Sequence, residues 1–408
     1  MAAGSFETPA DERGSGKLSV ADLDLKGKRV FLRTDLNVPL AQSRITDDTR
    51  IRVALPTIQH CLRAGASVVL ASHLGRPNGT PDPRYSLAPV AQRVGDFLRR
   101  AVPLAPDCVA SATLLQARAL NPGELLLLEN LRFHPGEEKN DREFARALGR
   151  LADCYVNDAF SASHRAHASL VGITRFLQPA AAGLLLQREV EALGRILDRP
   201  ERPLAAILGG AKVGDKLALV QNLLTRVDIL LIGGGMAFTF LKAQGHAVGR
   251  SLVEDGLLLK ASEFLLIARK RGVRLELPVD VVVGEGPEGK AKGVVPAGEI
   301  PSGLMGLDIG PASLARFREA LTAARTIVWN GPVGVFEKAE FAAGTVELAR
   351  AVAASGAFSM VGGGDTVAAI HQAGVGERIG YLSTAGGAFL EFLEGRSLPG
   401  IAALTDRG

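Results

Sequence analysis

The chain has 408 residues, of which 47% are hydrophobic and 22% are charged, and its formal net charge is +4. This length exceeds one compact core, so the composition predicts an ordinary globular protein of two domains. Basic residues do not cluster with aromatic residues, which argues against a nucleic-acid-binding protein. No apolar run approaches the length of a transmembrane helix. Residues 1–16 are small, polar and of mixed charge, and we expect a disordered extension there.

Short apolar runs that resemble strands recur after this extension, with helical patterns between most of them. The runs are Val30–Leu32, Ser67–Ala71, Leu125–Leu128, Leu204–Leu208, Ile229–Ile232, Val279–Val283, Thr326–Trp329 and Phe358–Val361. Two examples of the helical patterns are Asp215–Leu224 and Pro311–Ala324. This alternation predicts an α/β protein with two Rossmann-like lobes, each a parallel sheet with helices on both faces. Ligands of such sheets bind at the carboxyl ends of the strands.

The boundary between the lobes is expected within residues 186–203. Leu186, Val190, Leu193 and Leu197 share one helical face, and the stretch ends in a pair of prolines, Pro200 and Pro203. This pattern predicts a hinge helix. It separates an N-terminal lobe of residues 17–185 from a C-terminal lobe of residues 204–394.

The three cysteines are odd in number and lack the spacing of a metal site or a redox motif. Cys61, Cys108 and Cys154 are therefore interpreted as reduced, buried thiols. Together with an N-terminus that lacks an apolar signal core, they favour a cytoplasmic location.

Five motifs in the N-terminal half follow or adjoin strand-like runs and carry arginine or histidine. They are Arg33–Pro39, Arg50 in Asp-Thr-Arg-Ile, Ser72–Pro77, Glu129–His134 and Asn157–His167. A single arginine is more often a solvated surface residue. The repetition of Arg50, Arg76, Arg132 and Arg165 at successive strand ends nevertheless indicates a small, multiply anionic ligand, because guanidinium groups bind phosphate and carboxylate bidentately.

Asp35 and Asn37 in the first of these motifs are expected to bind a substrate hydroxyl. Arg33, His134 and His167 are interpreted as structural by default, with Arg33 paired to a neighbouring carboxylate.

The C-terminal half contains four glycine turns that follow strands. They are Gly209-Gly-Ala-Lys212, Gly233–Thr239, Gly331–Glu337 and Gly362–Thr366. Lys212 and Lys216 follow the first turn, but it is not a Walker P-loop, which needs a glycine four residues before Gly-Lys-Ser/Thr. Backbone amides at such turns bind phosphate, and Asp365 is suited to Mg²⁺. One loop alone would more often close a turn, with Asp365 as an N-cap; four together favour a nucleotide site.

The complete set of motifs resembles the phosphoglycerate kinase family. The family signature corresponds to Arg29-Val-Phe-Leu-Arg-Thr-Asp-Leu-Asn-Val-Pro39, and six further blocks follow in family order from Ser-His-Leu-Gly-Arg-Pro to Gly-Gly-Gly-Asp-Thr. The match extends from about Leu18 to the end of the chain. It implies reversible phosphoryl transfer between 1,3-bisphosphoglycerate and ADP, with Mg²⁺ as cofactor, in glycolysis, gluconeogenesis or carbon fixation. A monomer is also implied, as is a C-terminal tail of residues 395–408 that packs on the N-terminal lobe.

The resemblance also assigns roles to individual residues. The residues implied to bind the phosphoglycerate are Asp35, Asn37, Arg50, His73, Arg76, Arg132 and Arg165. Those implied to hold the nucleotide are Gly210, Ala211, Lys216, Gly306, Asn330, Glu337, Gly363, Gly364, Asp365 and Thr366, with Asp365 on the Mg²⁺. Arg50, Lys212, Gly363 and Gly386 are implied to act on the transferring group.

Two features depart from the family pattern. The family's Ser-Thr-Gly-Gly-Gly-Ala is Ser383-Thr-Ala-Gly-Gly-Ala388 here, and Ala385 would be strained if its backbone needed a positive φ. The N-terminal extension is the second departure.

The chemistry requires no general base, because the acceptor carboxylate is already ionised at neutral pH. Closure about the hinge helix is expected to exclude water from the reaction. The alternatives are another small-carboxylate kinase on a similar scaffold and a hinge-type two-domain binding protein, for which the usual export signal is missing. A dinucleotide oxidoreductase is disfavoured, because no strand is followed by Gly-x-Gly-x-x-Gly.

Overall fold

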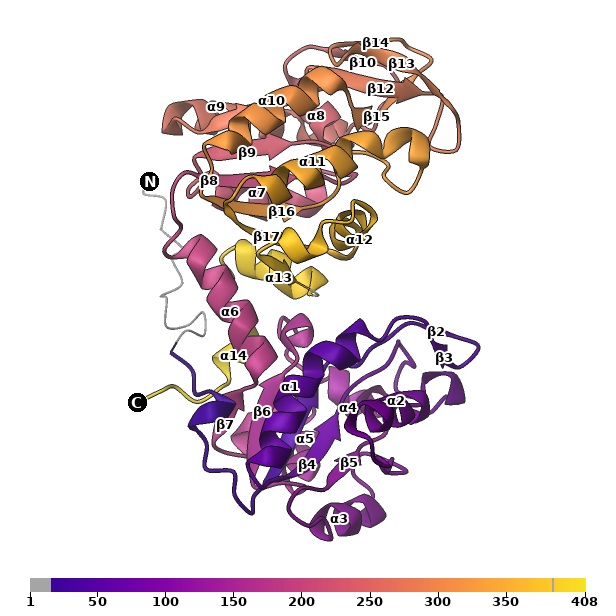
Figure 1. The fold of residues 1–408 in the computed structure, drawn as a ribbon, viewed down its shortest axis with the longest axis vertical. Coiled ribbons are helices and arrows are strands. Elements are labelled where there is room, and N and C mark those ends of the chain that lie inside the picture. Colours follow the sequence, from indigo (N-terminus) through magenta and orange to yellow (C-terminus); the bar gives the residue numbers. More distant parts are fainter. Residues whose placement is uncertain (1–15, 384) are drawn as a thin grey trace. The chain divides into compact units, whose positions relative to one another are not determined.

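The computed structural model describes residues 16–383 and 385–408, so the predicted disordered extension, apart from Gly16, lies outside the described residues. The chain divides into two compact units (Figure 1). Unit 1 comprises the described residues through Glu191 together with Arg396–Gly408, and unit 2 comprises Ala192–Gly395. No helix within the described ranges is long and apolar enough to cross a membrane.

Unit 1 is built on a five-stranded sheet with the order β5-β4-β1-β6-β7, in which all pairings are parallel. The strands of the whole unit are β1 (Arg29–Thr34), β2 (Leu40–Ala41), β3 (Arg44–Ile45), β4 (Ser67–Ala71), β5 (Leu125–Leu127), β6 (Cys154–Asp158) and β7 (Ala180–Ala182). Its helices are α1 (Thr49–Arg63), α2 (Ala88–Leu98), α3 (Ser111–Arg118), α4 (Pro135–Glu138), α5 (Arg142–Gly149) and α14 (Pro399–Ala402). The short strands β2 and β3 form a separate antiparallel hairpin.

The core of unit 1 follows from the strand period. In β1, Val30 and Leu32 face the cluster that Ile51 and Ile58 of α1 complete, whereas Phe31 points to the other face and stacks on Tyr155. Both faces of the sheet are therefore buried. This explains why the strands read as continuous apolar runs rather than alternating ones.

Unit 2 is built on a six-stranded sheet with the order β11-β9-β8-β16-β17-β18, again parallel throughout. The strands of this sheet are β8 (Leu204–Leu208), β9 (Ile229–Ile232), β11 (Arg274–Glu276), β16 (Thr326–Asn330), β17 (Phe358–Gly362) and β18 (Tyr381–Ser383). The helices of the unit are α7 (Leu217–Leu223), α8 (Met236–Ala243), α9 (Leu258–Arg271), α10 (Pro311–Thr322), α11 (Ala343–Ala354), α12 (Gly364–Gln372) and α13 (Gly386–Leu393). Ile207, Ile327 and Trp329 of the sheet pack on one face with Phe317 of α10 and Leu348 of α11.

Unit 2 also contains antiparallel strands, which the sequence analysis did not predict. A three-stranded sheet has the order β13-β12-β15, and β10 pairs with β14 outside it. The remaining strands are β10 (Ala247–Val248), β12 (Asp280–Gly284), β13 (Ala291–Pro296), β14 (Glu299–Ile300) and β15 (Met305–Ile309). The run Val279–Val283, apart from Val279, thus lies in β12, where Val281 and Val283 are buried and Val282 is less so. Such alternation is typical of a sheet with one solvated face.

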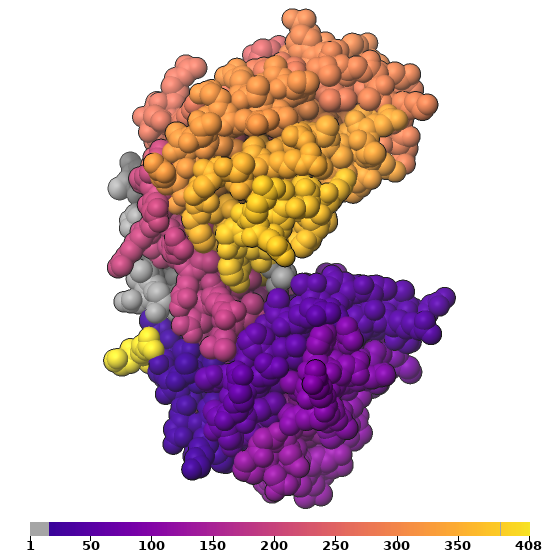
Figure 2. Space-filling model, viewed as in Figure 1, coloured from indigo at the N-terminus to yellow at the C-terminus, as the bar shows by residue number. Residues whose placement is uncertain are grey.

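The helix α6 (Leu184–Leu197) occupies the predicted hinge segment, beginning two residues earlier than expected and ending before Pro200. The chain end packs on unit 1, as the yellow terminal residues beside the indigo residues show in Figure 2. There Gly400 N donates to Ser163 O at 2.8 Å, and Thr405 N donates to Ala180 O at 2.9 Å. The predicted buried thiols Cys61, Cys108 and Cys154 are free and buried.

Candidate functional site

The polar motifs of unit 1 meet at one edge of its sheet. Arg33 of β1 pairs in register with Ala71 of β4, and Thr34 pairs with Asp158 of β6. The segments that follow these three parallel strands therefore emerge side by side. They carry Asp35, His73 and the loop that contains Arg165.

Asp35 is held by three contacts. Its Oδ2 accepts hydrogen bonds from Arg50 in the first turn of α1 and from the Ser161 hydroxyl, and its Oδ1 accepts from Asn37 N at 3.1 Å. Asn37 Oδ1 in turn accepts from Gly75 N at 2.8 Å. These bonds hold Asp35 and Asn37 against the His73–Arg76 loop.

His73 lies deeper, beside Arg33. Arg33 is 1% exposed and His73 is 5% exposed. The partners of Arg33 among the described residues are Thr34 O, Ser169 Oγ and His73 Nδ1, so it does not pair directly with a carboxylate as expected from the sequence. Ser169 bridges it to the buried Glu137.

The three remaining arginines occupy different environments. Arg132 is buried, donates to Gly75 O at 2.8 Å and pairs with Glu138 at 3.1 Å. Burial lowers the pKa of Arg132, and the charge of Arg165 lowers it further. Arg165 is half-buried and its Nε lies 3.2 Å from His164 Nε2. Arg76 is exposed and has no hydrogen bond or ion pair within the described ranges.

A cavity of about 460 Å³ in unit 2 collects part of the predicted nucleotide set. The predicted residues that line it are Gly210, Ala211, Gly306, Glu337 and Asp365. Most of the other lining is apolar, with Phe238, Leu252 and Leu307 among its side chains. None of these three was predicted as a site residue, although Phe238 stands in one of the glycine motifs. An apolar slot with a few polar groups at its edge suits a planar base joined to phosphates.

The glycine loops around this cavity are bonded to one another through their backbones. Gly210 N donates to Pro332 O at 2.9 Å, and Gly234 N donates to Val333 O at 3.0 Å. Gly210 and Gly331 have φ values of 104° and 91°, which L side chains rarely adopt. Backbone hydrogen bonds therefore hold the loops after β8, β9 and β16 together.

Lys216 lies beneath these loops. Its Nζ donates to Gly209 O at 2.5 Å and to Asn330 O at 3.1 Å, and burial lowers its pKa to about 8. Lys216 is the last residue of a short 3₁₀ turn, Gly214–Lys216, and α7 begins only at Leu217, two residues later than the predicted helical pattern. Lys212 is exposed, without a hydrogen bond or ion pair in the part of the chain that the structure describes.

The last glycine turn forms the N-terminus of α12. Gly363 is its N-cap, with φ 97°, and Asp365 lies in the first turn rather than at the cap. Thr366 Oγ1 accepts from Gly331 N at 2.8 Å, and Asn330 Nδ2 donates to Gly362 O at 2.9 Å, so this turn joins the other loops. Gly386 begins α13. Its neighbour Ala385 has φ −99°, so the strain considered for this position is absent.

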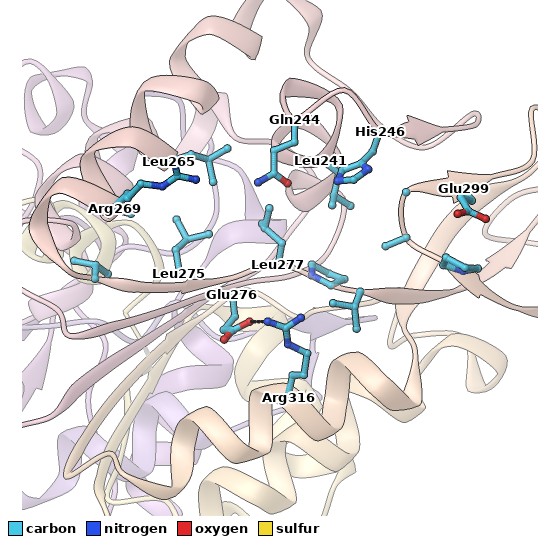
Figure 3. Close-up of a pocket in the computed structure, with 17 residues that line it drawn as sticks. Leu241, Gln244, His246, Leu265, Arg269, Leu275, Glu276, Leu277, Glu299 and Arg316 are labelled. Atoms are coloured by element: carbon cyan, nitrogen blue, oxygen red, sulfur yellow. Dashed lines mark hydrogen bonds and ion pairs between the residues drawn. The ribbon is translucent and has the colours of Figure 1, made fainter.

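A second cavity lies elsewhere in unit 2 (Figure 3). It has a volume of about 680 Å³ and lies among α8, α9, β11 and α10. Arg316 pairs there with Glu276 at 2.7 Å, and Glu276 also binds Arg274 at 2.9 Å. None of the predicted site residues lines it, and we assign it no role in the reaction.

The family model described as phosphoglycerate kinase matches residues 20–396. The chain is 56% identical over 394 residues to the phosphoglycerate kinase of Moorella thermoacetica, covering 96% of this chain and 100% of that one. It is 54% identical over 392 residues to the phosphoglycerate kinase of Pelotomaculum thermopropionicum, covering 96% of this chain and 100% of that one. The structure of phosphoglycerate kinase from Coxiella burnetii is similar at a TM-score of 0.88 and 46% identity, over 95% of this chain and 98% of that one. The structure of phosphoglycerate kinase from Pyrococcus horikoshii is similar at a TM-score of 0.82 and 36% identity, over 95% of this chain and 98% of that one.

The fold and these likenesses define the class as a two-unit α/β phosphotransferase whose acceptor is a carboxyl group. The chain belongs to the phosphoglycerate kinase family. Its activity is the glycolytic and gluconeogenic transfer of a phosphoryl group between 1,3-bisphosphoglycerate and ADP, giving 3-phosphoglycerate and ATP. Members of this family use MgATP.

Proposed function

We propose that unit 1 binds the phosphoglycerate at the edge where β1, β4 and β6 end. The observation that supports this most strongly is the continuous contact network from Arg50 through Asp35 and Asn37 to the Gly75 backbone, which Arg132 also contacts. Arg132 and Arg165 lie close enough to His73 to act on it electrostatically. Guanidinium groups around an accessible carboxylate and amide match a ligand with anionic ends and a hydroxyl between them.

We propose that the cavity of unit 2 binds the nucleotide. The apolar walls would hold the base, Glu337 at the rim would accept from the ribose, and the bonded glycine loops would present amides to the phosphates. The Lys216 ammonium group donates to Gly209 O and Asn330 O, so it connects the loops after β8 and β16 and places a positive charge next to them.

Asp365 fits a role in binding Mg²⁺. It is exposed, lines the cavity and lies in the first turn of α12. No cluster of three or more His, Cys, Asp or Glu side chains able to hold a metal exists within residues 16–383 and 385–408. A single carboxylate suffices for Mg²⁺, which keeps several waters and takes its other ligands from phosphate oxygens. The ion would neutralise charge on the phosphates.

Transfer of the phosphoryl group depends on how the two substrates are positioned and on the positive charge around the phosphoryl oxygens. The acceptor carboxylate attacks in its ionised form, so no side chain has to remove a proton. Arg50 and Lys212 supply positive charge to the phosphoryl oxygens, and the glycine amides orient them. We further propose a cytoplasmic location, because the three buried thiols are unpaired, and a monomeric state, which the family resemblance implies. Sedimentation at the concentration of the assay would test the oligomeric state.

The division of substrates between the units is tested by Arg165→Ala. A hydrogen bond to a charged group is worth about 1.5–3 kcal/mol, so KM for 3-phosphoglycerate is expected to rise about 10-fold or more. KM for ATP should stay within about twofold of the original enzyme. Arg142→Ala is the matched control, because Arg142 is exposed on the same unit and is not among the site residues. A rise in KM for ATP instead would show that the assignment of the units is wrong.

A further inference from the structure

The ring of His73 contacts a side chain that can only donate hydrogen bonds. Arg33 Nη2 lies 3.2 Å from His73 Nδ1, and both residues are buried. A guanidinium group has five N–H donors and no acceptor. His73 Nδ1 must therefore accept this bond and carries no proton. The ring is then neutral, and its single proton is on Nε2.

Arg33 is itself held in place by a buried chain of hydrogen bonds. Its Nε donates to Ser169 Oγ at 2.9 Å, and the Ser169 hydroxyl donates to Glu137 Oε1 at 2.6 Å. Ser169 N also donates to Glu137 Oε2 at 2.9 Å. Ser169 and Glu137 are fully buried, so water does not compete for these bonds.

The charges around His73 favour the same state of the ring. Burial lowers the pKa of His73 well below its ordinary value, and Arg33, Arg132 and Arg165 lower it further. Asp35 acts in the opposite direction, but it is already paired with Arg50. A positive charge on the ring would lie among the charges of these three arginines, which disfavours it.

We propose that Glu137, Ser169 and Arg33 are positioning residues that hold His73 as the neutral tautomer with its proton on Nε2. His73 then gives the ligand one directed hydrogen bond, and the arginines supply the positive charge. The inference deepens the proposed phosphoglycerate site and rests on the ligand being bound there.

The tautomer can be observed without any ligand. Long-range ¹H–¹⁵N correlation spectra of the uniformly labelled protein distinguish the two ring nitrogens, and His73→Gln identifies the signal. We expect His73 to remain neutral with the proton on Nε2 from about pH 8 down to about pH 5.5, whereas an ordinary histidine titrates within this range. A proton on Nδ1, or titration near the ordinary pKa, would overturn the proposal.

The positioning chain is tested by Ser169→Ala. Losing the bridge frees Arg33, so a second tautomer should become visible and KM for 3-phosphoglycerate should rise about 5- to 10-fold. The change in kcat should be much smaller. Glu137→Gln is the second variant, in case Ser169→Ala does not fold.

Thr113→Ala is the matched control. Thr113 is also fully buried in unit 1, but its hydroxyl donates to Asp107 O at 2.7 Å and is not connected to Arg33. It should leave both the tautomer and KM unchanged. An unchanged tautomer in the Ser169 and Glu137 variants would refute the positioning chain. An altered tautomer with unchanged KM would instead show that His73 does not contact the phosphoglycerate.

Discussion

Lys212 is exposed and has neither a hydrogen bond nor an ion pair among the residues described. Lys216, four residues later, is half-buried and donates hydrogen bonds to two carbonyl oxygens. The side chain of Lys216 is therefore held by the loops, whereas the side chain of Lys212 is free to move, as its proposed role at the phosphoryl group requires.

Replacing Lys212 by alanine should accordingly remove most of kcat. A charged donor to the transition state is worth about 100-fold or more in rate, while ground-state nucleotide binding loses little. Steady-state kinetics should show kcat reduced to about that extent and KM for ATP changed less than about threefold. Near-normal turnover would exclude Lys212 from the reaction. Lys242→Ala, which affects an exposed lysine paired with Asp255, is the control.

Ala385 should stabilise the loop before α13 rather than strain it. Its φ of −99° and ψ of 102° are ordinary for an L residue, and its side chain is buried. Ala385→Gly adds freedom to the unfolded chain and removes a buried methyl, so the free energy of unfolding should fall by about 1 kcal/mol. Denaturant unfolding would measure this, with kcat expected to be unchanged. A more stable variant would mean that the methyl is strained after all.

At the scale of elements, the start of α6 depends on a buried carboxyl group. Asp158 Oδ1 accepts from Leu185 N at 2.8 Å and from Leu186 N at 3.2 Å, while its Oδ2 is buried without a hydrogen-bond partner. Burial raises the pKa of Asp158 to about 7. The folded state therefore holds this proton more tightly than the unfolded chain, whose aspartate pKa is about 3.9.

The sign of the pH dependence follows from this difference. The contribution of Asp158 to the free energy of unfolding is fully present below about pH 4 and is lost as the pH rises through about 7. Asp158→Asn keeps the acceptor for both amides and places its NH₂ at the unpartnered oxygen. Relative to the original protein, its free energy of unfolding should rise by about 3 kcal/mol between pH 5 and pH 8. Denaturant unfolding at both pH values would test this, and a difference that does not vary with pH would contradict it.

Asp308 is the matched comparison in unit 2. Burial also raises its pKa to about 7, but both of its oxygens accept backbone bonds, from Ile309 N at 2.9 Å and from Gly344 N at 2.7 Å. Asp308→Asn would turn an NH₂ group against one of these amides. It should therefore lower the free energy of unfolding at pH 5, in contrast to Asp158→Asn, and the same proton linkage should reduce this loss as the pH rises through about 7.

The elements that were predicted best are those that packing determines. The run Leu204–Leu208 is β8 to the residue, and Ser67–Ala71 is β4, because strands buried on both faces are continuously apolar. The antiparallel sheet of β12, β13 and β15 could not be predicted in the same way. Its middle strand resembles the others in sequence, and only its pairing with the exposed β13 distinguishes it.

The site was harder to predict than the fold, for a physical reason. Motifs identify the side chains proposed to bind the ligand, whereas Ser161, Ser169 and Glu137 join the hydrogen-bond networks around them through contacts between residues far apart in sequence. A serine or a glutamate carries no signal of such a role until the fold places it. The apolar wall around Phe238 was missed for a similar reason, since apolar residues are expected in any core.

At the scale of the molecule, the proposal assigns one substrate to each unit, and hydrogen exchange can separate them. A ligand at 100 times its Kd stabilises the state that binds it by about 2.7 kcal/mol, which slows exchange through local opening about 100-fold. MgATP should protect the loops at 209–211, 331–334 and 363–366, while 3-phosphoglycerate should protect 72–76 and 160–167. The control segments are α3 and β13, which contribute no residue to either proposed site and should not respond to either ligand.

Hydrogen exchange without the metal tests the proposed role of Asp365 separately. If Asp365 acts through Mg²⁺, then ATP in excess EDTA should lose protection mainly at residues 363–366, while the loop at 209–211 retains part of it through its backbone amides. Asp365→Asn should reproduce the metal-free pattern in the presence of Mg²⁺. Protection at 363–366 that is indifferent to both changes would remove Asp365 from the metal site. Protection of unit 2 by 3-phosphoglycerate alone would instead contradict the division of the substrates, so the two proposals can fail independently.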